Sequence, residues 1–195
     1  MVFGIGENCT IQSSATISPS ALIEDGVEIG ANAVIEAFSH IKEDAVIGPN
    51  TVIGAEGLIS VSLSNGQPIR LKHMGGVEIG RGVVILAGAI VAKSLFRSFT
   101  YIGDYCQIGI MANIGHGASV GAYSVISGNT VIAGRTKLGA NVWVGASVSI
   151  AQGLVVGEKA QIKMGSVVIS DVAAGQVVSG NFAVPHKASM RDYLR

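Results

Sequence analysis

Aliphatic residues recur at every sixth position along most of this chain. The first series holds nine isoleucines, from Ile5 to Ile53, and a long second series runs from Ile102 to Val168. A short series between them comprises Ile79, Ile85 and Val91. An amphipathic helix repeats about every 3.6 residues and a half-buried strand every second residue, so neither explains this spacing. A fixed short period is typical of a repeat architecture.

Each six-residue unit predicts a short strand followed by a turn, with the aliphatic residue, here called the rung, pointing inward. Glycine often follows the rung, where we expect it to relieve the bend. Three units would close one triangular coil, and stacked coils would pair parallel strands about 4.8 Å apart. The expected fold is an all-β parallel solenoid. Small residues stand two positions before the rungs and should fill the corners, at Cys106, Ala112, Ala118, Ser124, Thr130 and Thr136.

The repeat is interrupted between the series. Residues 54–76 carry no rung and predict a loop excursion, and residues 92–101 are also irregular. Inserted loops on a rigid scaffold often carry function, although a tolerated surface insertion is an equal alternative. We therefore expect a β-solenoid over residues 1–174 and a C-terminal extension over 175–195. The pattern of residues 187–195 predicts a short amphipathic helix that caps the open end of the stack.

Composition narrows the functional classes. The 195 residues carry 13 basic and 13 acidic side chains, so no excess positive charge supports a nucleic-acid surface. Mean hydropathy is +0.52, yet the longest apolar stretch, Val83–Ala92, is about half a membrane span. No signal peptide is predicted. Cys9 and Cys106 lack disulfide or metal spacing and predict free thiols in a reducing, cytoplasmic compartment.

The repeat resembles the hexapeptide-repeat family, whose fold is a left-handed parallel β-helix. Within it, Arg70–Gly80 and Asn113–His116 resemble the UDP-3-O-acylglucosamine N-acyltransferases of lipid A (lipopolysaccharide) biosynthesis. The run Ile126–Gly139, which contains Ile-Ala-Gly-Arg-Thr-Lys, resembles the same branch. The N-terminal uridine-binding domain of that branch is not expected here, because the repeat already begins at Ile5.

This resemblance implies that His116 is a general base and that the backbone N–H of Gly134 stabilises an oxyanion. The spacing agrees, since 134 minus 116 is 18, one full coil. An imidazole can accept a proton from an attacking amine or hydroxyl near neutral pH. A surface histidine and a simple turn glycine are the alternatives. His40, His73 and His186 show no comparable constellation and are expected to be structural.

The resemblance also implies a thioester co-substrate, acyl-CoA or acyl-carrier protein, and no tightly bound cofactor. Gln152 lies another 18 residues beyond Gly134 and would contact the pantetheine amides. Arg135 and Lys137, with Lys159 and Lys163, are candidates for the donor phosphates or are solvated turn residues. Family members are typically homotrimers with sites shared between subunits, and the low charge of the predicted outer faces agrees with burial there.

The sequence departs from the lipid A enzymes at Val91–Ser94 and at Gly153. We therefore expect an N-acyltransferase that moves a shorter acyl chain to an amino sugar, with nucleotide-linked amino sugars included among the acceptors. An O-acyltransferase and a non-catalytic scaffold are the alternatives. A nucleotide-binding role has no glycine-rich motif behind it. A zinc site like that of γ-class carbonic anhydrases is disfavoured, because His73, His116 and His186 lack the required spacing.

Overall fold

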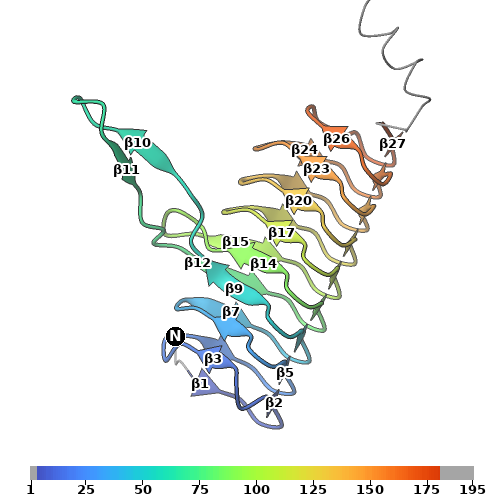
Figure 1. Cartoon of the computed structure of the whole chain (residues 1–195). Helices are drawn as coiled ribbons and strands as arrows, with labels where there is room; N and C mark the ends of the chain where they lie inside the picture. Colours follow the sequence, from blue (N-terminus) through green and yellow to red (C-terminus); the bar gives the residue numbers. More distant parts are fainter. Residues whose placement is uncertain (1–3, 181–195) are drawn as a thin grey trace, which may run out of the picture.

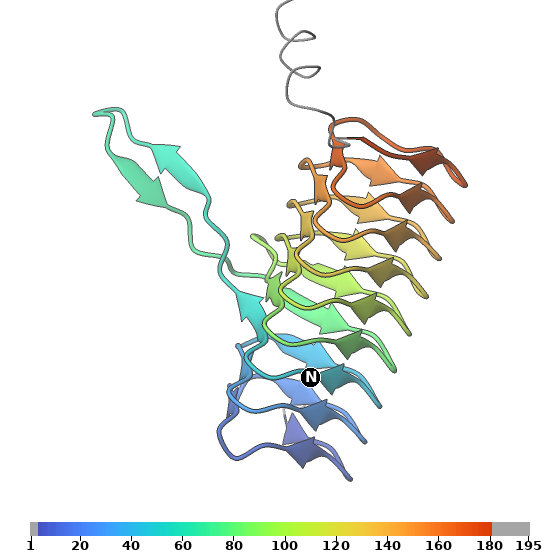
Figure 2. The same cartoon turned by 45° about the vertical axis from the view of Figure 1, so that its right-hand side comes forward.

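The computed structural model describes residues 4–180, which form a triangular prism of three parallel sheets. The chain passes from sheet A to sheet B to sheet C in every coil, and the coils stack along one axis (Figures 1 and 2). This confirms the predicted all-β solenoid. In residues 4–180 no helix is long and apolar enough to span a membrane. The predicted capping helix at 187–195 lies outside the described residues.

The strands are mostly two residues long. Sheet A contains β1 (Gly4–Ile5), β4 (Leu22–Ile23), β7 (Ser39–Ile41), β12 (Gly76–Ile79), β15 (Phe99–Ile102), β18 (Ser119–Val120), β21 (Lys137–Leu138) and β24 (Val155–Val156). Sheet B contains β2 (Thr10–Ile11), β5 (Glu28–Ile29), β8 (Val46–Ile47), β13 (Val84–Ile85), β16 (Gln107–Ile108), β19 (Val125–Ile126), β22 (Trp143–Val144), β25 (Gln161–Ile162) and β27 (Val177–Val178).

Sheet C contains β3 (Thr16–Ile17), β6 (Val34–Ile35), β9 (Val52–Ala55), β14 (Ile90–Ala92), β17 (Asn113–Ile114), β20 (Val131–Ile132), β23 (Ser149–Ile150) and β26 (Val167–Val168). The pairing of β25 with β27 extends the stack to residue 178, past the expected end at 174. Residues 54–76 also contain structure of their own, an antiparallel hairpin of β10 (Ser60–Ser62) and β11 (Pro68–Arg70).

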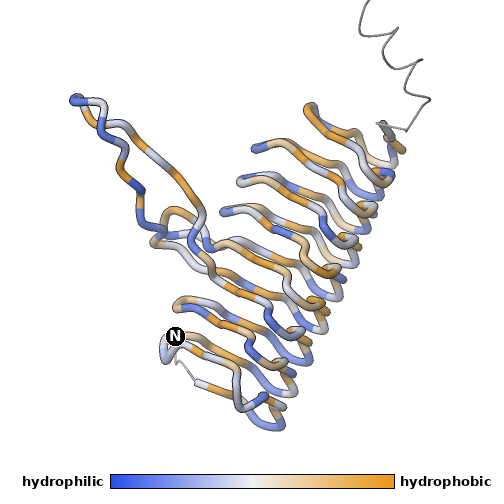
Figure 3. Tube along the Cα trace, viewed as in Figure 1, coloured by the Kyte–Doolittle hydropathy of each residue, from blue (hydrophilic) through white to orange (hydrophobic). Residues whose placement is uncertain are grey.

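The rungs form the core. From Ile23 to Ile162 they are almost fully buried, whereas Ile5, in the first coil, is 56% exposed because no coil covers it. Figure 3 shows hydrophobic stretches recurring in every coil. The small corner residues are buried as predicted, and their polar atoms are paired: the Thr130 hydroxyl donates to the Gly145 carbonyl at 3.0 Å. Burial raises the pKa of the Cys106 thiol to about 11.

The glycines after the rungs serve a different purpose from the one expected. Gly115 has no positive φ; instead a Cβ there would lie 2.5 Å from the backbone nitrogen of Gly134 in the next coil. The left-handed conformation falls three residues after the rung, as at Asn50 (φ 57°) and Asn129 (φ 55°). Glycine after the rung therefore permits close stacking of coils, and the bend itself is made further on.

Candidate active site

Both interruptions of the repeat lie at the same edge of the prism. Residues 56–75 connect β9 to β12, and residues 93–98 connect β14 to β15, so each links a sheet C strand to the next sheet A strand. We call this edge the C–A corner. The hairpin β10–β11 projects from it, away from the prism (Figures 1 and 2). His116, in the turn between β17 and β18, belongs to the same edge.

A column of residues runs up the C–A corner, one from each coil. The rungs Val91, Ile114, Ile132 and Ile150 pair in register. The residues two positions after the last three of these rungs therefore occupy equivalent places, namely His116, Gly134 and Gln152. Lys93 follows Val91 by the same count but begins the irregular segment 93–98, and the Gly117 N–H donates to the Thr100 hydroxyl instead of to the Lys93 carbonyl. The expected stacking of Gly134 on His116 is confirmed, since a Cβ on Gly134 would lie 2.5 Å from the His116 Nε2.

The turn itself does not require glycine at position 134. Gly134 has no positive φ, and alanine occupies the same turn position in other coils, at Ala122, Ala140 and Ala146. What the position excludes is a side chain facing the imidazole of His116. Gly134 is buried, and within residues 4–180 its N–H donates no hydrogen bond.

The electrostatic surroundings of His116 favour a neutral imidazole. The residue is half-buried, and burial is the main cause that lowers the pKa of its side chain. The neighbouring His73 and Arg135 lower the pKa further by charge repulsion. The backbone N–H of Arg135 donates to the His116 carbonyl at 2.9 Å, which fixes the two turns against each other. A neutral imidazole can accept a proton at neutral pH.

His73 is part of this constellation, contrary to the expectation that it has none. It lies between the hairpin and β12, is 2% exposed, and its ring centroid is 5.5 Å from that of His116, at 69°. Gly57 packs on both rings: a Cβ there would lie 3.1 Å from the His73 Nε2 and 3.6 Å from the His116 Cδ2. His40 is elsewhere, on β7 against Glu24, and His186 is outside the described residues.

Charged residues of the two irregular segments meet in the coil before that of His116. Lys93 is only 9% exposed, and its Nζ lies 3.9 Å from the Glu56 Oε1, while the Arg70 Nη2 lies 3.4 Å from the Oε2 of the same carboxylate. Two cations thus share one carboxylate. In the sequence Lys93 is only a departure from a family motif, and no repeat spacing relates it to Glu56, because both residues lie in segments that lack the repeat.

The remaining candidates separate into two groups. Gln152 and Arg135 are exposed at the C–A corner, and Lys137 lies on β21, the sheet A strand that follows it. Lys159 follows β24 and Lys163 follows β25, so they occupy the other two corners of the prism. Lys159 pairs with Glu158, and the Lys163 ammonium lies 5.2 Å from the Trp143 ring centroid. These two lysines do not join the column within one chain.

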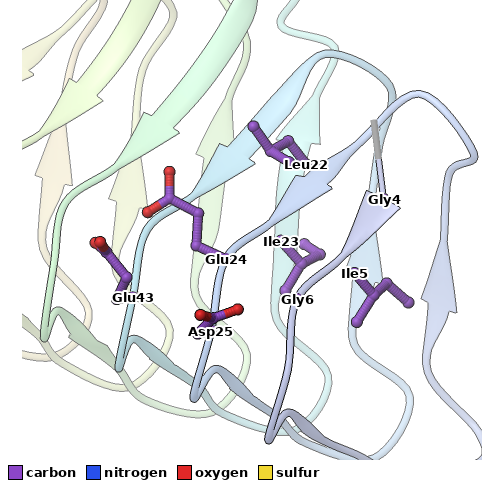
Figure 4. A pocket seen from close by; sticks show the side chains of 8 residues that line it. All are labelled: Gly4, Ile5, Gly6, Leu22, Ile23, Glu24, Asp25 and Glu43. Atoms are coloured by element: carbon purple, nitrogen blue, oxygen red, sulfur yellow. The ribbon is translucent and has the colours of Figure 1, made fainter. Parts of the chain in front are cut away.

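A larger hollow, of about 650 Å³, lies at the N-terminal end of the prism and is lined by Glu24, Asp25 and Glu43 (Figure 4). Its acidic groups are already engaged, since Glu24 contacts His40 and Asp25 accepts the Glu7 N–H. Glu43 pairs with Arg81, which is the main cause that lowers the pKa of Glu43 to about 2. No cluster of metal-binding side chains occurs in residues 4–180.

Comparison with known families identifies the class of this protein. The bacterial transferase hexapeptide family (six repeats) matches residues 4–37, 26–59 and 99–134, and the hexapeptide repeat of succinyl-transferase matches residues 135–170. Together these matches cover well over half of the chain. The chain therefore belongs to the hexapeptide-repeat transferases, which confirms the predicted family. A comparison with curated protein sequences finds no match.

Solved structures agree with this assignment. The UDP-N-acetylglucosamine acyltransferase from Campylobacter jejuni superimposes with a TM-score of 0.80 and 24% identity, covering 92% of this chain and 68% of that one. The enzyme of the same name from Bacteroides fragilis 9343 gives 0.76 and 22%, covering 98% and 74%. The UDP-N-acetylglucosamine O-acyltransferase from Moraxella catarrhalis RH4 gives 0.56 and 25%, covering 95% and 76%. The fold is thus the left-handed β-helix of hexapeptide acyltransferases.

Proposed function

We propose that this protein transfers an acyl group from acyl-CoA or acyl-carrier protein to the amino group of an amino sugar, with nucleotide-linked sugars as the first acceptors to test. The observation that carries the proposal is the pairing of His116 with Gly134. A half-buried imidazole, biased toward its neutral form, faces a glycine whose N–H has no partner in the described part of the chain. A base beside an oxyanion donor is the arrangement that acyl transfer requires.

The reaction follows from this geometry. The amine nitrogen attacks the thioester carbonyl while His116 accepts a proton from that nitrogen. The carbonyl oxygen becomes an oxyanion, which the Gly134 N–H stabilises by a hydrogen bond. The intermediate then collapses, the C–S bond breaks, and the proton on His116 passes to the leaving sulfur. The products are an amide and a free thiol, and no covalent enzyme intermediate forms.

The acyl donor would lie along the C–A corner beyond His116. Gln152, one coil past Gly134, supplies backbone and side-chain amides for the pantetheine arm. The exposed Arg135 and Lys137 are suited to the donor phosphates, because charge-assisted hydrogen bonds to phosphate are strong. The acceptor would approach from the opposite side, where Lys93, Glu56 and His73 lie.

An O-acyltransferase is the second candidate, and the names of the similar structures favour it, since the Moraxella catarrhalis enzyme is an O-acyltransferase. A hydroxyl acceptor would use the same base and oxyanion donor. A non-catalytic scaffold is the third candidate, and it alone predicts no turnover. We further propose a homotrimer that acts in the cytoplasm, where the two free cysteines would stay reduced.

The test incubates the protein with acetyl-CoA, longer acyl-CoAs and acyl-carrier protein against a panel of amino sugars and hydroxyl acceptors, and follows thiol release. We expect turnover with an amino sugar and a loss of about a hundredfold or more in His116→Ala, because the base is removed. His40→Ala is the matched control, since His40 lies outside the C–A corner. Equal rates for His116→Ala and wild type would refute the base, and turnover with hydroxyl acceptors alone would favour the second candidate.

A further inference from the structure

His73 is a buried polar group without a visible function in folding. The residue is 2% exposed, and neither nitrogen of its buried ring makes a hydrogen bond within residues 4–180. A neutral imidazole carries one donor and one acceptor. Leaving both unpaired in the interior is unfavourable, and such a group in a native protein calls for a catalytic role or a missing partner.

In the described part of the chain, His73 makes a ring contact with His116, the proposed base. The two imidazoles meet edge to face with centroids 5.5 Å apart. Gly57 covers both, and a side chain there would press on His73 at 3.1 Å. A catalytic base is commonly oriented by a third group, yet no hydrogen bond to the His116 ring is found in the described part of the chain. The residue after it is Gly117, which offers no side chain for that purpose.

We propose that His73 is the positioning residue of the base: its buried imidazole holds the His116 ring toward Gly134 and donates to it or accepts from it during proton transfer. The inference rests on the proposed function, in which His116 is the base. Hydrogen bonds of this kind are often long before substrate binds and shorten in the complex. The two rings then act as one unit, which a simple packing role for His73 would not require.

The charges around the pair determine how it titrates. Two charged or titratable groups face His116: His73, which lies in the segment before β12, and Arg135, which lies in the turn of the next coil. Lys93 lies in the preceding coil and pairs with Glu56. Protonation of both imidazoles would place two like charges side by side, which is unfavourable. Removing His73 removes one of the groups that lower the pKa of His116. The pKa of His116 should therefore rise.

Two substitutions separate orientation from charge. His73→Phe keeps a buried ring but loses both nitrogens, and we expect kcat to fall roughly ten- to hundredfold with KM nearly unchanged, as misplacement of a catalytic group does. His73→Gln returns a neutral donor and acceptor, so it should recover much of kcat. His116 must be neutral to accept a proton, so activity falls as the pH is lowered through the His116 pKa. In both variants this fall should begin at a higher pH than in wild type. His40→Phe serves as the matched histidine control.

The decisive measurement is an NMR titration of the His116 imidazole in wild type, His73→Phe and His73→Gln, with thermal unfolding to establish that each variant is folded. A rise in the His116 pKa in both variants, together with recovery of kcat in His73→Gln alone, supports the proposal. An unchanged His116 titration, or kcat equal in His73→Phe and wild type, overturns it. Retained activity in His116→Ala would instead refute the role of His116 as the base. The NMR titration of the other proteins would still show whether the two rings are coupled.

Discussion

Gly134 carries the sharpest prediction at the scale of single residues. In Gly134→Ala the new methyl group would lie 2.5 Å from the His116 Nε2, so the imidazole must move. The turn should tolerate alanine, as Ala122 and Ala140 show at the equivalent position. We expect a loss of roughly tenfold to a hundredfold in kcat, since displacement of a catalytic group is costly, with little change in thermal unfolding. Thiol release and circular dichroism measure the two quantities.

Gly4→Ala is the control for that experiment, because a Cβ at Gly4 meets no atom within 4 Å. Activity equal to wild type in Gly134→Ala would mean that the imidazole can shift without cost, and the close stacking would then have no catalytic significance. A large drop in melting temperature would instead assign Gly134 a role in the turn.

The residue scale also shows what a periodic sequence reveals. Residues 18 apart lie in register in successive coils, so the spacing alone was sufficient to place Gly134 on His116. His73 lies in the segment of residues 56–75, which has no period, and its 43-residue separation from His116 gives no indication of contact. Its partner could be found only from the path of the chain. The roles of His116, Gly134 and Gln152 are still predictions.

At the scale of elements, the hairpin β10–β11 should be separable from the β-helix. It pairs with no strand of the three sheets among residues 4–180, and Ser60 is paired directly with Arg70. Replacing residues 61–69 by two glycines would therefore close the loop without strain on the coils. We expect thermal unfolding to stay within a few degrees of wild type, because each coil contacts mainly its neighbours.

The comparison for this deletion is a rung substitution. Ile114→Ala should destabilise the chain by about 2–5 kcal/mol, as expected for a large-to-small change in a packed core, since Ile114 is fully buried. A deletion that destabilises the protein as much as Ile114→Ala would show that the hairpin packs on the coils. The periodic rungs predicted correctly which residues form the core, whereas the hairpin inside the excursion carried no repeat to reveal it.

At the scale of the whole molecule, one face of the prism differs from the other two. The residues of sheet C that point outward carry no charge, and they are Thr16, Val34, Val52, Ile90, Asn113, Val131, Ser149 and Val167. Sheet A presents His40, Glu78 and Lys137 outward, and sheet B presents Glu28. Because this contiguous uncharged face borders the C–A corner, we expect it to be the surface that a second copy of the chain covers in the proposed homotrimer.

The last prediction tests that assembly together with the site beside it. Val131 is 44% exposed on sheet C, one coil above Asn113, so Val131→Glu would place a charge in the proposed interface. Burying an unpaired carboxylate is costly, and we expect light scattering to fall from three copies of the 19.9 kDa chain to one. Gln161→Glu, on sheet B, should leave the mass unchanged. Because the C–A corner adjoins sheet C, dissociation should also abolish thiol release; a monomeric variant with full activity would show instead that one chain completes the site alone.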